Sequence, residues 1–550
     1  GTWDGEQIIP ASFVATVGTP NPATAGTPVA PEIATEFEGA SERYGVMWWT
    51  NADGELPGVP TDAYWGWGLR DSLIIVIPSL DLVVVRAGDR WRPGNWNPDY
   101  AVIEPFLVPI MLSLAPDSSN PSIALSAPAA SSWLTRTVSI EGTAEDNVAV
   151  ASVTLEVDGT IVDNQPYTDG YRFDLDTRLY PDGAHTLTVT AADYAGNTVS
   201  SSFQVTTDND PGDYAPPYPD SETIIGIELA EENAMIRLAN GSDNWPITWA
   251  DDGDMYTAYG DGFGFRRELP TKHSLGFAKV VGDYPDFDGI NIRSPDEIEG
   301  GVGNRGQKGS GMLMVDGVLY LWVRNADENG QECELMWSVD YAENWTYTGW
   351  RFEELGFCAF LNFGQNYAGA RDGYVYMYSP DTTSARDETD NLVLTRVPTD
   401  QILVESAYEF YAGEDLAGSP VWSANIADRA PIFTFTNGVN RISVVHNATL
   451  DVYLLVMRAR DKLEQGNPNH FSIYEGPEPW GPWSTVYYTE TFYDQPPPTQ
   501  GHGGWDESVR IPSKWIDDDG ENLRILCSCG DYFAVVPARL TVNQQSPISE

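Results

Sequence analysis

Carboxylates gather on both sides of an aromatic stretch, MYTAY, in the C-terminal half of the chain. Asp251, Asp252 and Asp254 precede this stretch, and Asp261 follows it within YGDGFGF. Hydrolysis of a glycosidic bond uses two carboxyl groups about 5–10 Å apart, and the glycines beside Asp261 allow a tight turn that exposes its carboxylate. We therefore take Asp261 and Asp252 as candidate catalytic carboxylates. Asp251 and Asp254 are candidate ligands of Ca²⁺, the one cofactor that the sequence suggests, with solvated turn acids as the alternative.

Basic residues are scarce, with 30 Lys and Arg among 550 residues, so those in glycine-rich motifs stand out. Lys308 lies in GNRGQKGSG, Arg324 near the end of VLYLWVRN, and Arg371 and Asp372 in GARDG. Elimination beside a uronate needs a cation that neutralises the carboxylate and a base that removes a proton, and Arg can bind a carboxylate with two hydrogen bonds. Lys308 and His446 complete the candidate catalytic set. Pairing with the abundant acids is the alternative for each base.

Other polar and aromatic side chains are suited to hold a sugar by hydrogen bonds or stacking. The candidate substrate-binding residues are His273, Arg324, Asn366, Tyr367, Arg371, Asp372, Lys514 and Trp515. Tryptophans would stack on sugar faces where they are exposed, whereas rows of aromatic residues more often form core.

The net charge of the chain is −51, with 81 Asp and Glu. Such a surface repels phosphate backbones, so we exclude nucleic acid as a partner. No run of 18 apolar residues exists, so the sequence predicts no membrane span. The longest apolar stretch, LIIVIPSLDLVVV (73–85), predicts a two-stranded hairpin because Pro78 and Asp81 interrupt it. Such acidity suits a secreted or salt-adapted protein. The resemblances given below imply a secreted, cell-surface or periplasmic bacterial protein with a polysaccharide or glycan as its partner.

The four cysteines show no spacing typical of zinc sites. Cys527 and Cys529 are two residues apart on a predicted strand, which makes a disulfide between them geometrically unfavourable. A bridge between Cys333 and Cys358 is the pairing that the sequence leaves open.

A repeat organises residues 220–543. A turn followed by an alternating aromatic strand recurs five times, at intervals of roughly 55–75 residues. The copies are DDGDMYTAYGD, VDGVLYLWVRN, RDGYVYMYSPD, HNATLDVYLLVM and DDDGENLRILCS. Units of this length, with about four strands each, predict a five-bladed β-propeller; an ordinary β-sandwich with coincidental hairpins is the alternative.

Residues 120–208 predict a small β-sandwich. Short alternating strands (TVSIEGTA, ASVTLEVDG, YRFDLDT, HTLTVTAAD and SSFQVTT) are separated by turns such as Asp158-Gly159. The stretches EDNVAVASVTLEVDG and YPDGAHTLTVTAADYAGNT resemble bacterial Ig-like modules of secreted proteins. This resemblance implies a spacer or presentation role.

The motifs YGVMWWTN and AYWGWGLRDSLIIVIPSLDLVVVRAG, within residues 1–115, resemble the C-terminal part of serine beta-lactamase-like hydrolases. That family's Ser-x-x-Lys nucleophile motif and Tyr-x-Asn element have no matching segment here, and without them no acyl-enzyme forms. The resemblance implies an incomplete α/β fragment, either a remnant or part of a domain that begins upstream.

The C-terminal motifs MYTAYGDGFGF, GQKGSGMLMVDGVLYLWVRN and EGPEPWGPWSTVYYTE resemble a bacterial propeller family that includes endo-D-arabinofuranosidases. The resemblance implies a mainly β protein, with the propeller preceded by the Ig-like sandwich and the N-terminal fragment. Hydrolysis of a polysaccharide by paired Asp residues is the favoured function. A lyase using His or Tyr with Arg or Lys, a non-catalytic glycan- or protein-binding protein, and accessory domains of a truncated serine hydrolase are the alternatives.

Overall fold

The computed structural model describes residues 117–209, 215–266, 271–301, 303–459, 470–490 and 508–543. In the N-terminal part it describes 48–54, 58–68, 72–87, 103–114 and a few separate residues, so much of the predicted 1–115 fragment lies outside the described residues. The chain forms two compact units. One comprises residues 1–128, 139–174 and 185–204, and the other comprises 129–138, 175–184 and 205–550.

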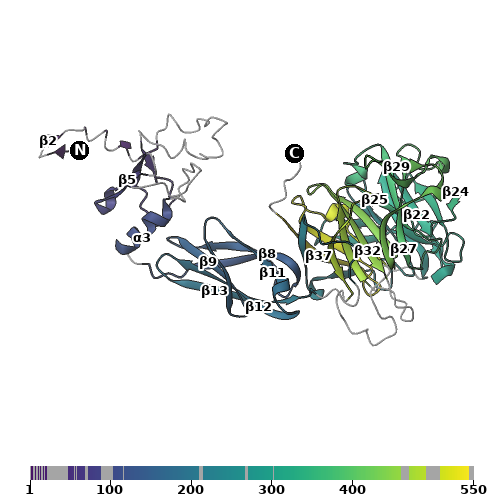
Figure 1. Ribbon diagram of the computed structural model, residues 1–550, viewed down its shortest axis with the longest axis horizontal. Coiled ribbons are helices and arrows are strands. Elements are labelled where there is room, and N and C mark those ends of the chain that lie inside the picture. Colours follow the sequence, from purple (N-terminus) through teal and green to yellow (C-terminus); the bar gives the residue numbers. More distant parts are fainter. Residues whose placement is uncertain are drawn as a thin grey trace. The chain divides into compact units, whose positions relative to one another are not determined.

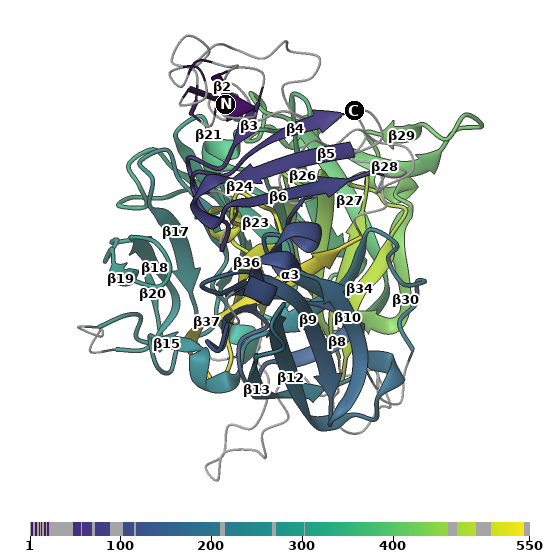
Figure 2. The same ribbon diagram turned by 90° about the vertical axis from the view of Figure 1, so that its left-hand side faces the viewer.

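A four-stranded antiparallel sheet occupies the described N-terminal segments. Its strands, in spatial order, are β3 (Trp49–Thr50), β4 (Tyr64–Gly68), β5 (Ser72–Ile77) and β6 (Leu82–Arg86), and β4, β5 and β6 lie side by side in Figure 2. The predicted hairpin is confirmed, because Ile77 pairs with Leu82 across a turn that contains Pro78 and Asp81. Helix α3 (Glu104–Leu114) contributes Leu107 to the core of this sheet.

Seven strands follow in the region of the predicted β-sandwich. They are β7 (Ser122–Ala127), β8 (Trp133–Glu145), β9 (Val150–Val157), β10 (Thr160–Pro166), β11 (Tyr171–Asp176), β12 (Gly183–Asp193) and β13 (Thr198–Thr207). Along β9 and β12, buried residues alternate with partly exposed ones, as expected for strands with one face in a core.

Residues 220–543 form antiparallel groups of strands, drawn from teal to yellow in Figure 1. The first group is β16 (Ile247–Trp249), β17 (Met255–Tyr259), β18 (His273–Val281) and β19 (Asp288–Asn291), with β20 (Ile298–Glu299) beside β18. The second group is β21 (Lys308–Val315), β22 (Val318–Arg324), β23 (Cys333–Ser338) and β24 (Thr346–Phe352).

The third group is β25 (Ala359–Asn362), β26 (Tyr374–Pro380), β27 (Thr389–Pro398), β28 (Glu409–Glu414) and β29 (Pro420–Ser423), with β30 (Pro431–Val439) also paired to β27. The fourth group is β31 (Arg441–Asn447), β32 (Val452–Ala459), β33 (His470–Gly476) and β34 (Ser484–Thr489).

The fifth group combines strands from both ends of this region. Strands β35 (Val509–Arg510), β36 (Asn522–Cys527) and β37 (Phe533–Val542) are followed in the sheet by β14 (Ile224–Leu229), and β15 (Ile236–Leu238) also pairs with β37. Because β14 precedes all the other groups in the sequence, its pairing with β37 joins the beginning of the region to its end.

The first strands of the five groups contact one another in succession: β16 with β21, β21 with β25, β25 with β31, and β31 with β35. The turn of 3-10 helix after β35, η11 (Ser513–Trp515), contacts β16 and completes the circuit. The strand predicted in each of the five repeats is the second strand of its group. Strands β22, β26 and β32 are buried on both faces, which explains why they are nearly continuous apolar and aromatic runs, whereas β36 leaves Asn522 and Arg524 partly exposed.

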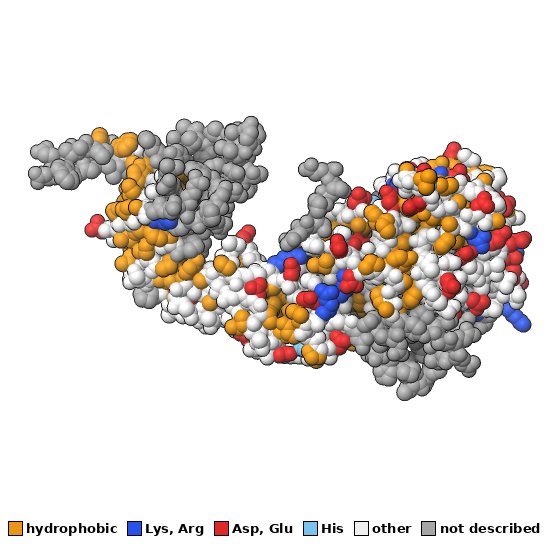
Figure 3. Space-filling view, viewed as in Figure 1, with side chains coloured by type: hydrophobic (Ala, Val, Ile, Leu, Met, Phe, Trp, Pro, Cys, Tyr) orange, Lys and Arg blue, Asp and Glu red, His pale blue; other side chains and the backbone are white. Residues whose placement is uncertain are grey.

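Aromatic side chains fill the space between neighbouring groups. Trp322 and Trp245 are completely buried, and the ring of Trp322 packs against Phe352 and Tyr408. These two tryptophans therefore serve the core and are unavailable for stacking on a sugar. Among the described residues, no helix combines the length and apolar character that crossing a membrane requires. Figure 3 shows many carboxylates and few basic side chains on the visible face of residues 220–543.

The expectation against a Cys527–Cys529 disulfide is wrong: the two residues form a disulfide, with Cα atoms 5.2 Å apart. The reason is that β36 ends at Cys527 and the chain turns at once, so Cys529 does not continue the extended geometry of the strand. Cys333 and Cys358 are buried free thiols, although the Cys358 amide donates a hydrogen bond to the Cys333 sulfur.

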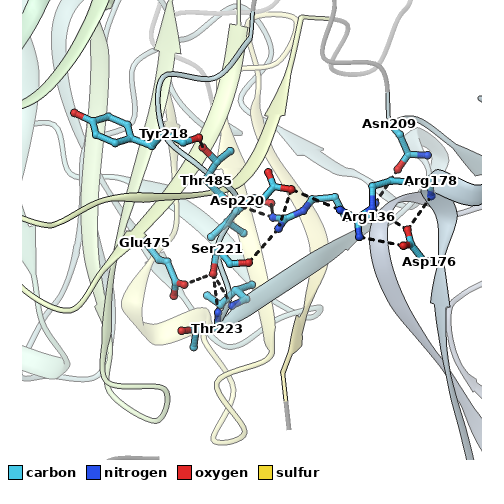
Figure 4. Close-up of polar contacts among 12 residues, drawn as sticks. Arg136, Asp176, Arg178, Asn209, Tyr218, Asp220, Ser221, Thr223, Glu475 and Thr485 are labelled. Atoms are coloured by element: carbon cyan, nitrogen blue, oxygen red, sulfur yellow. Dashed lines mark hydrogen bonds and ion pairs between the residues drawn. The ribbon is translucent and has the colours of Figure 1, made fainter. Parts of the chain in front are cut away.

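A polar network fixes the segment that leads into β14 (Figure 4). The guanidinium of Arg136 donates hydrogen bonds to the carbonyl oxygens of Ser221, Thr485 and Val486, and it lies 3.5 Å from the Asp220 carboxylate. The Ser221 hydroxyl donates to Glu475. All of these residues belong to the second compact unit.

Candidate active site

Asp261 and Lys308 form an ion pair where β21 begins. The Nζ atom of Lys308 lies 2.6 Å from Oδ1 of Asp261; the Lys308 side chain is 3% exposed and that of Asp261 is 22% exposed. Lys272 lies further away, at 3.9 Å from the same oxygen. The Asp261 carboxylate is thus partly exposed to solvent, and the buried Lys308 ammonium fixes its position.

The backbone around Asp261 is shaped for this position. Asp261 has a φ of 43°, in the left-handed region that few non-glycine residues adopt. A Cβ atom on Gly262 would lie 2.0 Å from the Ser242 hydroxyl, so a larger residue does not fit at this position. The Ser242 hydroxyl is held there because it accepts hydrogen bonds from the amides of Phe263 and Gly264. Left-handed backbone in a non-glycine residue costs about 1–3 kcal/mol and is often found at functional sites.

A second carboxylate, Asp243, lies beside Asp261 in the fold. Its backbone exchanges two hydrogen bonds with Gly260, the residue directly before Asp261. Asn244 donates from Nδ2 to Asp243 Oδ1 at 2.5 Å and accepts a 2.8 Å hydrogen bond from Nη2 of Arg324. Our sequence reasoning missed Asp243 and Asn244. Their position in the motif SDNWP, directly before the first strand of the first group, could have identified them as candidates.

Lys308 and Arg324 are buried cations beside these carboxylates, and Arg510 is a third buried cation, close enough to Arg324 to be affected by its charge. Lys308 and Arg324 are directly paired positions of β21 and β22, and Arg510 donates from Nη2 to the carbonyl oxygen of Ser310 at 3.0 Å. Burial lowers the pKa of Lys308 and Arg324 lowers it further, whereas Asp261 acts in the opposite direction. Burial together with Arg324 lowers the pKa of Arg510 to about 9. Sequence reasoning also missed Arg510.

A narrow cavity lies among the first strands and reaches Arg510. It has room for about one water molecule, so a sugar does not enter it. Its lining comes from all five groups: Ile247, Thr248, Trp249, Gly311, Met312, Phe360, Asn362, Ser443, Val444, Arg510, Ile511, Pro512 and Ser513. Any polysaccharide must therefore bind outside this cavity.

His273 lies at the same end of the first group as Asp261, because His273 pairs with Gly262. Its ring is buried, with Nδ1 2.9 Å from the carbonyl oxygen of Thr271 and Nε2 3.9 Å from the Glu297 carboxylate. Burial raises the pKa of Glu297. His273 is thus held by Thr271 and Glu297 behind the site.

The other predicted site residues lie at the opposite end of the strands. Strand β21 runs from Lys308 to Val315, a span of about 20 Å. The amide of Gly317, just beyond that far end, donates to Asn366 Oδ1, and Gln365 donates to the carbonyl oxygen of Ala250. The predicted residues at this far end are Asp251, Asp252, Asp254, Asn366, Tyr367, Arg371, Asp372, His446, Lys514 and Trp515.

Several of these far-end residues have partners that explain them structurally. Lys514 Nζ lies 2.9 Å from Asp283 Oδ1 and donates to the carbonyl oxygens of Gly253 and Gly282. Trp515 is buried in a core cluster. His446 pairs with Asp451 at 3.1 Å.

Further far-end contacts involve Arg371 and Tyr367. Arg371 pairs with Glu478 and also contacts Asp372. Tyr367 is buried and its hydroxyl donates to the carbonyl oxygen of Tyr374.

The two predicted calcium ligands also have other partners. Asp254 forms a 3.0 Å ion pair with Lys279, and Asp251 accepts a hydrogen bond from the hydroxyl of Tyr341. In the described part of the chain, the group of three carboxylates that lie close enough together to share a metal ion is Asp117, Asp146 and Asp193, whose oxygens lie within 4.8 Å of one another.

Comparison with known proteins assigns part of the chain. The family model of the bacterial Ig domain matches residues 121–189. No curated protein matches the chain.

Several solved structures match the chain with low TM-scores. A GH43_1 enzyme from Xanthomonas citri is 12% identical, with a TM-score of 0.31, over 58% of this chain and 96% of that one. A GH62 hydrolase in complex with xylotriose is 10% identical, with a TM-score of 0.29, over 59% of this chain and 97% of that one. Fibronectin(III)-like modules of Clostridium thermocellum CbhA are 19% identical, with a TM-score of 0.13, over 16% of this chain and 96% of theirs.

Proposed function

We propose that this protein is an extracellular carbohydrate-active enzyme that hydrolyses a polysaccharide at Asp261 and Asp243. The observation that carries the proposal is the partly exposed Asp261 carboxylate held by the buried Lys308, with a second carboxylate next to it in the fold. Residues 220–543 are then a five-bladed β-propeller whose blades are the five strand groups. The narrow cavity marks the propeller axis.

The chemistry follows from the two carboxyl groups. One protonates the leaving oxygen of the glycosidic bond, and the other activates water or attacks the sugar carbon. The ion pair with Lys308 suits Asp261 to the role that requires an anion, since a fixed cation orients the carboxylate. Asp243 is the proton donor in this scheme. Asn244 and Arg324 position it through the hydrogen bonds that link Arg324 to Asn244 and Asn244 to Asp243.

The Ig-like module acts as a spacer in this proposal. The family match at 121–189 and the seven strands of the region support that role. The Ser-x-x-Lys motif has no match in the N-terminal sequence, and this proposal places the enzymatic activity in residues 220–543.

A polysaccharide panel tests the proposal on the full chain. Reducing ends and absorbance near 235 nm are followed together, because elimination creates a conjugated double bond and hydrolysis does not. Release of reducing ends without the absorbance, lost in D261N and in D243N, is the expected result. Both signals together would replace hydrolysis by elimination, and neither signal on any polysaccharide would leave a glycan-binding protein.

A further inference from the structure

Arg510 is a buried cation without an acidic partner among the described residues. Its side chain lies at the end of β35 and the residue is 6% exposed. The hydrogen bond from its Nη2 goes to a neutral group, the carbonyl oxygen of Ser310. Its Nε is buried and has no hydrogen-bond partner. A buried charge normally requires a counter-charge, so an arginine in this state indicates a missing anion.

The charges around Arg510 increase this need. The charge of Arg324 acts on Arg510 and has the same sign. Lys308 is a third buried cation, and the carboxylates of Asp261 and Asp243 stabilise its charge. Among these side chains, three are cations and two are carboxylates, and Arg510 is the cation for which the described residues offer no acidic partner.

The cavity beside Arg510 has the size and the lining for such an ion. The cavity has room for about one water molecule, so it admits a single-atom anion but excludes a carboxylate. Residues with hydroxyl or amide side chains are among its lining, namely Thr248, Asn362, Ser443 and Ser513. Such groups donate hydrogen bonds, and no Asp or Glu lies among the lining residues, so the lining suits an anion and not a cation.

We infer that this cavity is a halide site, in which Arg510 and the lining hydroxyl groups bind one chloride ion. The chloride neutralises Arg510 and joins the first strands of different groups, since Arg510 lies in β35, Ser443 in β31 and Thr248 in β16. Bound chloride therefore stabilises the native protein, independently of any action on a polysaccharide.

Thermal unfolding of the full chain provides the first test. At constant ionic strength, replacing gluconate by chloride is expected to raise Tm in a saturable way over about 1–200 mM chloride, because a ligand that binds only the native state stabilises it. R510M is expected to lose this rise. S443A removes one hydrogen bond to the ion and is expected to weaken the apparent chloride affinity about tenfold. R371M is the matched control, because Arg371 pairs with Glu478 at the far end, and it is expected to keep the full response.

Crystals grown in bromide provide the second test, with an anomalous peak expected in the cavity beside Arg510. If R510M does not fold, S443A and the bromide peak decide the question. The inference is overturned if chloride raises Tm no more than gluconate, if S443A and R510M both respond like the unaltered protein, or if bromide is absent from the cavity.

Discussion

The Lys308 ammonium lies 2.6 Å from the carboxylate of Asp261, although 47 positions separate the two residues in the chain. Lys308 begins the first strand of the second group, and Asp261 follows the second strand of the first group. The ion pair therefore joins two neighbouring groups of strands. The Asp261 carboxylate is held in this position only when both groups are folded.

Asp261 and Asp252 differ in their expected contribution to activity. D261N is expected to lower the rate of polysaccharide hydrolysis by about 10³-fold, the usual scale for a group that transfers a proton in the transition state. D252N is the matched control, because Asp252 lies beyond the other end of β17 and accepts a hydrogen bond from Tyr256. Reducing-end release by the two variants and the unaltered protein measures the difference. Equal losses of hydrolysis rate in D261N and D252N would contradict the assignment of Asp261 to the active site.

Lys308 is expected to stabilise the native state through Asp261. K308M is expected to lower the free energy of unfolding by about 2–3 kcal/mol, because it leaves a carboxylate in a poorly solvated place without its cation. The double variant K308M/D261N is expected to recover at least about 1 kcal/mol of this loss. Urea unfolding of the four proteins in this cycle gives the coupling energy, and a coupling near zero would show that the pair makes no energetic contribution.

His470 is expected to make the protein sensitive to acid. It is completely buried, with Nε2 2.8 Å from the carbonyl oxygen of Gly438, and burial lowers its pKa to about 3. Unfolding exposes the ring, which then takes up a proton below its ordinary pKa near 6.5. The free energy of unfolding therefore falls with decreasing pH between about 6.5 and 3, by up to about 1.4 kcal/mol per pH unit from this residue. Denaturant unfolding at several pH values should show a smaller slope for H470Q, and identical slopes would refute this assignment.

The two free cysteines are expected to be unreactive in the native protein. Cys333 and Cys358 are completely buried, and burial raises the pKa of the Cys358 thiol well above its ordinary value. A thiol reagent should label none of the cysteines in the native state, two in denaturant, and four after reduction of the Cys527–Cys529 disulfide in denaturant. Two equivalents of label without denaturant would show that this core opens readily.

Local patterns were enough to predict the strands. The alternating aromatic strands predicted after turns such as Asp316-Gly317 are the second strands of their groups. Strands β22, β26 and β32 are more continuously apolar than an alternating pattern, because both of their faces are covered. The cysteine prediction failed for a local reason of a different kind. It assumed that the strand continues past Cys527, whereas the chain turns there.

The grouping of the acids shows the limit of proximity in sequence. Asp252 and Asp261 are nine positions apart, yet β17, Met255–Tyr259, runs between them and carries the chain to the other end of the sheet. Asp243 and Asp261 are twice as far apart in sequence, and the antiparallel hairpin of β16 and β17 brings them back to the same end. The chain reverses direction at each turn of an antiparallel sheet, so successive turns lie at opposite ends of the sheet.

The sequence by itself determined the β-rich architecture, the repeated turn-and-strand unit and the acidic surface, because periodicity, turn residues and charge are local properties. Only the tertiary structure decided which cations face which carboxylates. Lys308 and Arg324 pair across one hairpin, whereas Arg510 lies in β35, far along the sequence. Arg510 reaches Ser310 of the second group because the first strands of the five groups contact one another in succession, and the burial of all three side chains follows from packing that no single segment specifies.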